Sequence, residues 1–398
     1  MIKHIRIQNF RSLSDVSVDL APLTVLIGRS GTGKSNFVQA IRLLRNVLSS
    51  QQQHQMGFQF GGVTNILPAG DSKGWLSFSI RLAIPGLPEE LIYDIRFGGN
   101  TSHGNSVGNA SLFLRFPSEE KLTSGKEIVY HQQNGEWIIP PAITPAPPPG
   151  QIVLGSMSGV RHATIARVAL TTGIGCYDFP GSVLQVQSGV GFGQFPNQAS
   201  ENGAGFTDDG SSYLTTAASI LDDLRRLGDW SSLSSALGAV NRAVKSVDLQ
   251  QPERNRLNVG LGYKGKLLIL DAAQESVGFR RFLAHMLALY QSPPKQTLIF
   301  EHPESSIHPG AMTALFEEFE NYVRSERGQI ILTTHSPQLL DHFSPEKIRV
   351  VSIKNLETRI GPLAPEQSES VHEHLMGPGE LLTVDPARLE GQLDEVPG

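Results

Sequence analysis

The amino-acid sequence predicts an α/β fold with a mixed sheet, interrupted by an inserted middle region. Near the N-terminus, a short apolar strand at residues 23–27 leads through a glycine-rich loop into apolar residues at helical spacing. Near the C-terminus, apolar helices alternate with buried strands at 297–300 and 330–334, a pattern typical of a parallel sheet covered on both faces. The segment between these two blocks has neither pattern.

The loop after the first buried strand reads G-x-x-x-x-G-K-S, the pattern of a P-loop. Its glycines allow backbone N–H groups to wrap around phosphate oxygens, and the following helix adds its positive N-terminal end. We expect Lys34 to reach the β- and γ-phosphates and the Ser35 hydroxyl to bind Mg²⁺. The sequence therefore predicts a site for ATP or GTP with Mg²⁺. The residues expected to contact the nucleotide here are Gly28, Gly31, Gly33, Lys34, Ser35 and Asn36.

The first third of the chain is expected to be rich in strands. Residues 1–50 predict strand, turn, strand, phosphate loop and helix in that order. Residues 76–82 and 91–97 alternate apolar and polar side chains, so we expect them to pair as antiparallel strands. The prolines at 138–141 and 145–149 exclude the interior of a strand or helix, which indicates an extended connector or a loop.

The middle of the chain carries fewer signals. Residues 187–212 are rich in Gly, Ser and Asn and predict a long loop, and helices are expected at 217–227 and 231–247. The expected organisation is an N-terminal half of the nucleotide domain at 1–100, an inserted region at 101–264, a C-terminal half at 265–355 and a tail at 356–398.

Three later segments carry residues that suit a nucleotide site. Glu301 ends a buried strand, where a carboxylate can hold Mg²⁺ beside Ser35. His335 follows the next strand and can hydrogen-bond the γ-phosphate or its attacking water. Ser276 and Gly278 open a helix and form a second anion site, which in a head-to-tail pair would close over the partner's ATP. A plain helix cap is the alternative interpretation of Ser276.

Composition and charge exclude several classes. The chain has 398 residues, a formal net charge of −5 and one cysteine, Cys176, so no disulfide or cysteine-rich zinc site can form within it. The acidic balance offers no overall electrostatic argument for nucleic acid. No apolar run approaches the roughly 20 residues of a membrane span, and the N-terminus lacks the apolar core of a signal peptide. We expect a cytoplasmic protein without a membrane partner.

These motifs, in this order, resemble those of the RecF/SMC/ABC class of ATPase heads, and more narrowly the AAA-type ATPases of overcoming-lysogenization-defect (OLD) nucleases and related phage-defence proteins. The resemblance covers about residues 1–100 and 265–355. It implies ATP and Mg²⁺ as ligands, dimerisation around ATP, and Glu301, His302 and His335 as the catalytic set. Nuclease-type relatives carry a Toprim domain, of which this sequence shows no acidic cluster, so we expect any nuclease or toxin to be a separate polypeptide.

One departure from the family pattern lies at His302, where relatives usually carry the glutamate that polarises the attacking water. A histidine can act as a base near neutral pH, and Glu304 is a second candidate. We therefore expect slow hydrolysis or a switch dominated by binding. Arg280 and Arg281 are expected either to touch phosphate or a partner, or to lie on a solvated helix face. His285 and His308 are expected to be structural.

Three functions remain open at the level of the sequence. The first is an ATP-driven switch that dimerises and controls a separate effector in bacterial anti-phage defence. The second is a RecF-like DNA-repair ATPase that binds double-stranded DNA, which the absence of Lys/Arg runs weakens. The third is a scaffold that is stabilised by ATP and does not hydrolyse it.

Overall fold

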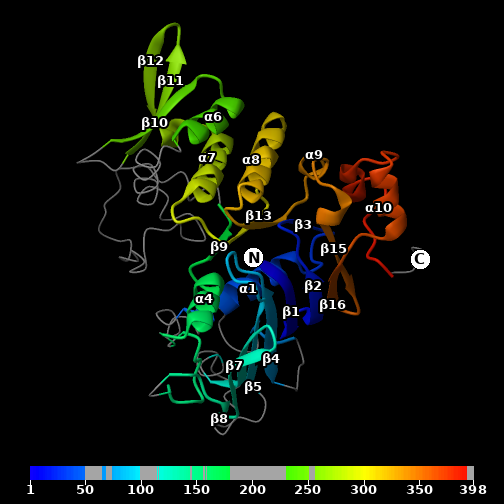
Figure 1. The fold of residues 1–398 in the computed structure, drawn as a ribbon. Helices are drawn as coiled ribbons and strands as arrows, with labels where there is room; N and C mark the ends of the chain where they lie inside the picture. Colours follow the sequence, from blue (N-terminus) through cyan, green and yellow to red (C-terminus); the bar gives the residue numbers. More distant parts are fainter. Residues whose placement is uncertain are drawn as a thin grey trace. The chain divides into compact units, whose positions relative to one another are not determined.

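The computed structural model describes residues 1–49, 65–68, 74–98, 114, 116–143, 146–155, 157, 159–179, 230–250 and 256–391 (Figure 1). The chain divides into two compact units. Unit 1 comprises residues 1–174 and 344–398, and unit 2 comprises residues 175–343. The predicted loop at 187–212 and the predicted helix at 217–227 lie outside the described residues.

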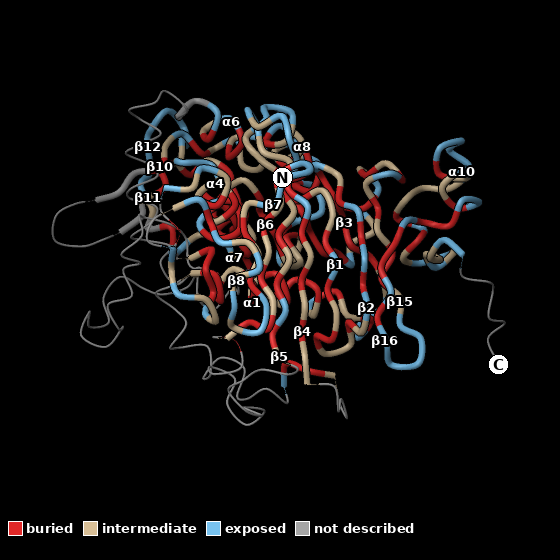
Figure 2. Tube along the Cα trace, turned by 60° about the horizontal axis from the view of Figure 1, so that its bottom comes forward, coloured by how far each residue is buried: buried red, intermediate tan, exposed pale blue. Residues whose placement is uncertain are grey.

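Unit 1 contains a seven-stranded antiparallel sheet in the order β2-β1-β4-β5-β6-β7-β8. Alternation of apolar and polar residues explains it, because every second side chain of β4 and β5 is buried. Figure 2 shows these buried positions in red along β1, β4 and β5. The predicted antiparallel pairing of 76–82 with 91–97 is confirmed. The strands are β1 (Ile2–Phe10), β2 (Leu13–Asp19), β4 (Trp75–Leu82), β5 (Leu91–Gly98), β6 (Pro117–Ser124), β7 (Glu127–Gln133) and β8 (Glu136–Ile139).

A second group of strands in unit 1 carries the phosphate loop. All five residues of β3 (Leu23–Ile27) are buried, and the strand pairs in parallel with β15 (Ile348–Lys354). Strand β16 (Glu357–Gly361) pairs antiparallel with β15, although the sequence predicted a tail from residue 356 onwards. Helix α1 (Lys34–Leu48) follows the loop, and its apolar side chains face the core. The other α-helices described in this unit are α4 (Arg161–Leu170) and α10 (Pro365–His372).

Unit 2 contains two sheets and four α-helices within its described residues. Strands β13 (Thr297–Glu301) and β14 (Gln329–Thr333) pair in parallel, in the order β14-β13-β9, and β9 spans Ile174–Tyr177. The second sheet has the order β10-β11-β12, with strands at Val244–Gln250, Arg256–Tyr263 and Lys266–Asp271. The helices are α6 (Trp230–Val240), α7 (Val277–Tyr290), α8 (Met312–Arg324) and α9 (Pro337–Leu340).

The predicted helix at 231–247 is correct only in its first part. Helix α6 ends at Val240, and residues 244–250 form β10, which pairs antiparallel with β11. Val244 and Val247 fit the spacing of a helix, but both are buried in the sheet. Cross-strand packing with β11 therefore overrides the local periodicity. None of the helices in the described part of the chain combines the length and apolar character that a bilayer crossing requires.

A buried carboxylate holds the connector after β8 against the sheet of unit 1. Glu120 on β6 is fully buried and accepts hydrogen bonds from the hydroxyls of Tyr93 and Tyr130, both at 3.0 Å. It also accepts from the backbone N–H groups of Val153 and Leu154, at 2.7 and 2.9 Å. Burial raises the pKa of Glu120, although these donors oppose the rise. A buried carboxylate without hydrogen-bond partners costs free energy on folding. The hydrogen bonds from Val153 and Leu154 to Glu120 therefore fix residues 153–154 in place.

We expect Glu120→Gln to destabilise the protein by about 2 kcal/mol. The glutamine NH₂ group is itself a donor, so some of the N–H and O–H groups that donate to the carboxylate would lose their acceptor. Urea denaturation of the full chain measures this change. Glu119→Gln is the matched control, since the neighbouring Glu119 is partly exposed and pairs with His131. Its expected effect is below about 0.5 kcal/mol. Equal effects of the two substitutions would contradict the assigned role of Glu120.

Candidate functional site

The phosphate loop is held against β15 by close backbone approach. Gly28 has a φ of 153°, and a Cβ at this position would lie 2.1 Å from the carbonyl oxygen of Val351. A Cβ on Gly33, whose φ is 109°, would lie 2.1 Å from Thr358 Oγ1. A side chain at Gly31 would meet open space, although its φ of 80° favours glycine. Two of the three glycines are thus required by contact and the third by conformation.

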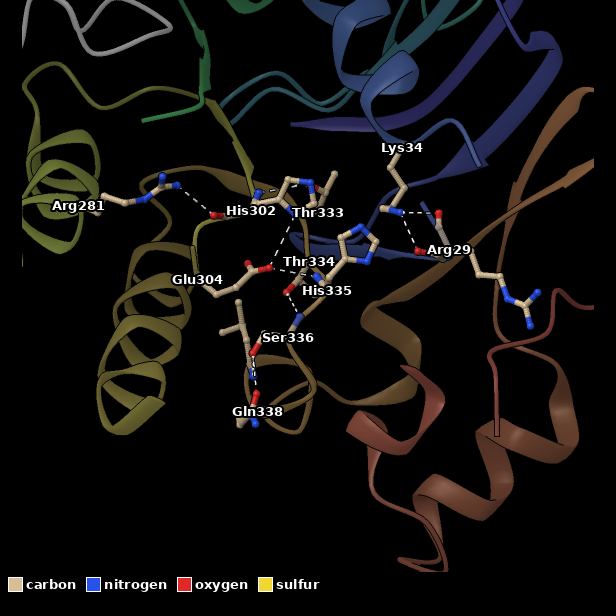
Figure 3. Close-up of polar contacts among 12 residues, drawn as sticks. Arg29, Lys34, Arg281, His302, Glu304, Thr333, Thr334, His335, Ser336 and Gln338 are labelled. Atoms are coloured by element: carbon tan, nitrogen blue, oxygen red, sulfur yellow. Dashed lines mark hydrogen bonds and ion pairs between the residues drawn. The ribbon is translucent and has the colours of Figure 1, made fainter. Parts of the chain in front are cut away.

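Lys34 lies over the loop that precedes it. Its Nζ donates to the carbonyl oxygens of Gly28 and Arg29 at 2.7 and 3.0 Å (Figure 3). Burial lowers the pKa of Lys34 to about 8. Carbonyl oxygens carry only partial charge, so a phosphate at the same place would bind this ammonium group more strongly. Ser35, the next residue, is exposed at the start of α1.

A chain of hydrogen-bonded polar side chains supports the phosphate loop. Asn36 Nδ2 donates to Ser12 Oγ at 2.8 Å, and Ser12 Oγ lies 2.7 Å from Thr358 Oγ1. Thr358 in turn donates to the carbonyl oxygen of Thr32 at 2.8 Å. The side chain of Asn36, predicted to contact the nucleotide, is thus engaged in positioning the loop. Sequence reasoning missed Thr358, because it lies 326 residues from Thr32 and no local pattern links them.

In unit 2 the predicted acidic and histidine residues lie at the ends of two paired strands. Glu301 ends β13 and is in register with Thr333 at the end of β14. His302 follows at once with a φ of 47°, uncommon for a residue with a side chain. Its backbone N–H donates to the Thr333 carbonyl at 3.1 Å. The imidazole rings of His302 and His335 stack with centroids 5.0 Å apart and 9° between their planes.

Glu304 connects these two histidines (Figure 3). Its Oε1 accepts from the backbone N–H of His335 at 3.0 Å and lies 3.7 Å from His302 Nδ1. Burial by itself raises the pKa of Glu304, but hydrogen bonds from His302, His335 and Thr334 outweigh it and leave the pKa below its usual value. The carboxylate is therefore ionised at neutral pH and acts as an acceptor. This geometry favours a positioning role for Glu304 over the role of base that the sequence left open.

Ser276 and Gly278 have structural roles at the start of α7. Ser276 is the N-cap, and its Oγ accepts from the N–H of Phe279 at 3.2 Å. A Cβ on Gly278 would lie 2.4 Å from the carbonyl oxygen of Ser306, so glycine allows α7 to approach the segment after β13. A cavity of about 570 Å³ opens here, lined by both residues and by Glu275, Asn241 and His308 among others. The capping role is compatible with an anion at the same helix end.

Arg280 and Arg281 do not lie on a solvated helix face, which corrects one of the two predicted interpretations. Both are buried, 4% and 5% exposed. Arg281 Nη2 donates to the carbonyl oxygen of His302 at 3.1 Å, which ties α7 to the peptide of the candidate catalytic residue. His285 is buried among Phe179 and Phe300, and burial lowers its pKa to about 3, as expected of a structural histidine. His308 caps the short helix after it.

The residues of unit 1 fit a nucleoside triphosphate. The loop leaves open space at Gly31, and the exposed Ser35 offers its hydroxyl oxygen as a ligand for Mg²⁺. The Lys34 ammonium group points at oxygen acceptors. No group of three or more His, Cys, Asp or Glu side chains that could hold a metal occurs in the described part of the chain. A Mg²⁺ bound through one or two protein ligands and phosphate oxygens does not need such a group.

Comparison with known proteins finds similarity to ATPase domains. A model described as "AAA ATPase domain" matches residues 1–82, and one described as "AAA domain, putative AbiEii toxin, Type IV TA system" matches residues 225–341. An OLD nuclease of Thermus scotoductus is 41% identical over 44 residues, which are 11% of this chain and 8% of that protein. The chain thus spans a small part of this relative's length.

Solved structures of SMC heads have a similar fold. An SMC head bound to the C-terminal winged-helix domain of ScpA matches with a TM-score of 0.58 and 12% identity, covering 92% of this chain and 99% of the other. An SMC head domain with an extended coiled coil, bound to the C-terminal domain of ScpA and derived from Pyrococcus furiosus, gives 0.52 and 10%, covering 94% and 99%. At such identities the likeness concerns the fold. Two AAA-domain models thus match separate parts of this chain, its fold is similar to that of SMC heads, and a short segment is similar to an OLD nuclease.

Proposed function

We propose that this protein binds ATP with Mg²⁺, hydrolyses it slowly, and uses the bound state as a switch that controls a separate effector. The observation that carries the proposal is the P-loop, which has Lys34 over its carbonyls and Ser35 exposed at the helix start. The positions of Glu301 at the end of β13 and of His302, Glu304 and His335 just after the strand ends support hydrolysis.

In the proposed ATP complex, the loop N–H groups and Lys34 hold the phosphates. Phosphate would replace the Gly28 and Arg29 carbonyls as acceptors of Lys34 and raise its pKa from about 8, so the ammonium form persists at neutral pH. Ser35 and Glu301 would hold Mg²⁺, which supplies neutralisation of the phosphate charge. The role of the loop residues is therefore orientation and charge compensation.

His302 is the proposed acceptor of the proton from the attacking water. Glu304 lies 3.7 Å from its Nδ1 and, as an ionised carboxylate, stabilises the protonated imidazole. The Arg281 guanidinium donates a hydrogen bond to the His302 carbonyl oxygen. The stacked ring of His335 would hydrogen-bond the γ-phosphate. Because an imidazole replaces the family's usual glutamate, we propose slow turnover, and an ATP-stabilised scaffold is the outcome if His302 accepts no proton.

Dimerisation is proposed to complete the site. Ser276 and Gly278 of a second copy would meet the γ-phosphate with the N-terminus of α7, next to the cavity at that helix end. The similarity to SMC heads and to an OLD nuclease supports a paired head and an associated nuclease or toxin. We propose anti-phage defence as the setting, because of the OLD similarity.

The test of this function is steady-state ATP turnover by the purified full chain. We expect measurable turnover that Lys34→Ala abolishes, because the substitution removes the ammonium group that faces the phosphates. Lys126→Ala is the matched control, since Lys126 is exposed in the turn between β6 and β7. Tight binding of ATP without turnover would contradict hydrolysis, and absence of binding would contradict the whole proposal.

Glu304→Gln is expected to lower the turnover number by about tenfold or more while leaving ATP affinity nearly unchanged. The amide keeps the size of the side chain but loses the charge that stabilises protonated His302 and holds His335. Turnover and equilibrium binding of ATP, measured on the same preparation, separate the two effects. Glu317→Gln, on the exposed face of α8, serves as the control. Unchanged turnover in Glu304→Gln would remove Glu304 from the mechanism.

A further inference from the structure

The β11–β12 hairpin of unit 2 exposes an unusual amount of apolar side chain. Tyr263, Leu267, Leu268 and Ile269 are 63%, 57%, 49% and 61% exposed. The turn between the strands is tight, with Lys264 and Gly265 at φ of 47° and 75°, typical of a two-residue type I′ connection. The hairpin extends away from α6 and α7 (Figure 1). An exposed apolar patch of this kind on a projecting element is typical of an interaction surface.

Strand β12 is also the edge of its sheet. In the described residues it pairs with β11 and stands at the end of the order β10-β11-β12. Natural edge strands usually carry charges, prolines or bulges that prevent pairing with another chain. Between Lys266 and Asp271, β12 carries four consecutive aliphatic residues, Leu267 to Leu270, and no such protection. An apolar edge with no further partner among the described strands favours addition of another strand.

Leu267 and Ile269 lie on one face of the hairpin. In register they stand opposite Gly262 and Gly260 on β11, which have no side chains. A Cβ at Gly260 would lie 2.4 Å from Ser246 Oγ and 3.2 Å from Leu267 Cδ1, so glycine is required there. The two aliphatic side chains therefore have no larger side chain directly opposite them on β11 and stay more than half exposed.

We propose that β12 pairs antiparallel with β12 of a second copy, with the two-fold axis at Leu268. In this register, residues that lie opposite each other are equally far from Leu268 along the two strands. Leu267 therefore lies opposite the partner's Ile269, and Leu268 lies opposite the partner's Leu268. Lys266 lies against an apolar Leu270, whereas parallel pairing would place Lys266 beside its equivalent, and like charges directly opposite are destabilising. The strand is thus complementary to itself in one direction, as an isologous interface requires.

This contact needs no nucleotide and is distinct from pairing around ATP. It joins two copies through the hairpin and leaves the P-loop uninvolved. The proposal therefore stands or falls separately from the ATPase proposal, and every measurement below is made without nucleotide and repeated in Lys34→Ala.

The first test is the mass of the full-length protein in solution, by sedimentation equilibrium. We expect a dimer in the wild type and in Lys34→Ala, and a monomer in Ile269→Lys, because a lysine at this edge would replace a buried apolar pair with a charge. Val384→Lys is the control, since Val384 is exposed but lies in unit 1, and it should remain dimeric. A monomeric wild type, or a dimeric Ile269→Lys, would overturn the proposal.

A second test does not depend on how Ile269→Lys folds. Leu268→Cys places one thiol on the proposed axis, so a short bismaleimide should link two copies in high yield. Tyr263→Cys, on the same hairpin and more exposed than Leu268, is far from its equivalent in this register and should not be linked. The native Cys176 is buried and does not compete. Absence of linkage at position 268, or equal linkage at both positions, contradicts the register.

Discussion

The close approach of Gly28 to the backbone of β15 sets where the phosphate loop can lie. A Cβ would stand 2.1 Å from a carbonyl oxygen that belongs to the sheet itself and has little freedom to move. Once the loop rests on β15, Thr358 of the neighbouring β16 reaches the carbonyl of Thr32, and Ser12 and Asn36 complete the support. The loop is therefore positioned by strands from both ends of the chain, which preorganises its N–H groups for phosphate.

In unit 2 a single carboxylate has the corresponding role. Glu304 accepts from the backbone of His335 and faces the ring of His302, so one ionised group joins the two strand ends in addition to the backbone hydrogen bond from His302 to Thr333. Arg281 adds a link from α7 to the same His302 peptide. Ser276 and Gly278 lie at the first turn of this helix, about one turn before Arg281. Binding of an anion at the helix N-terminus would therefore occur about one turn from the residue that contacts His302. This proximity gives the proposed dimer contact a physical route to the proposed chemistry.

Much of the architecture could be predicted from the sequence because its signals are local. The P-loop pattern, the alternation in 76–82 and 91–97, and the apolar strands at 297–300 and 330–334 each depend on neighbouring residues. The sequence wrongly predicts helix at 244–247, because Val244 and Val247 have helical spacing and only the pairing with β11 makes the segment a strand. The buried state of Arg281 and the contact of Thr358 depend on residues distant in sequence, and single-sequence patterns contain no such information.

We propose that ATP binding involves both the P-loop of unit 1 and the strand-end residues of unit 2. Hydrogen–deuterium exchange with and without ATP–Mg²⁺ tests it most directly. The account predicts protection by ATP in peptides that cover residues 28–36 and also in peptides that cover 301–304 and 333–336, both lost in Lys34→Ala. Protection confined to the P-loop peptides would contradict the claim, because the histidine and carboxylate group would then have no part in the nucleotide site.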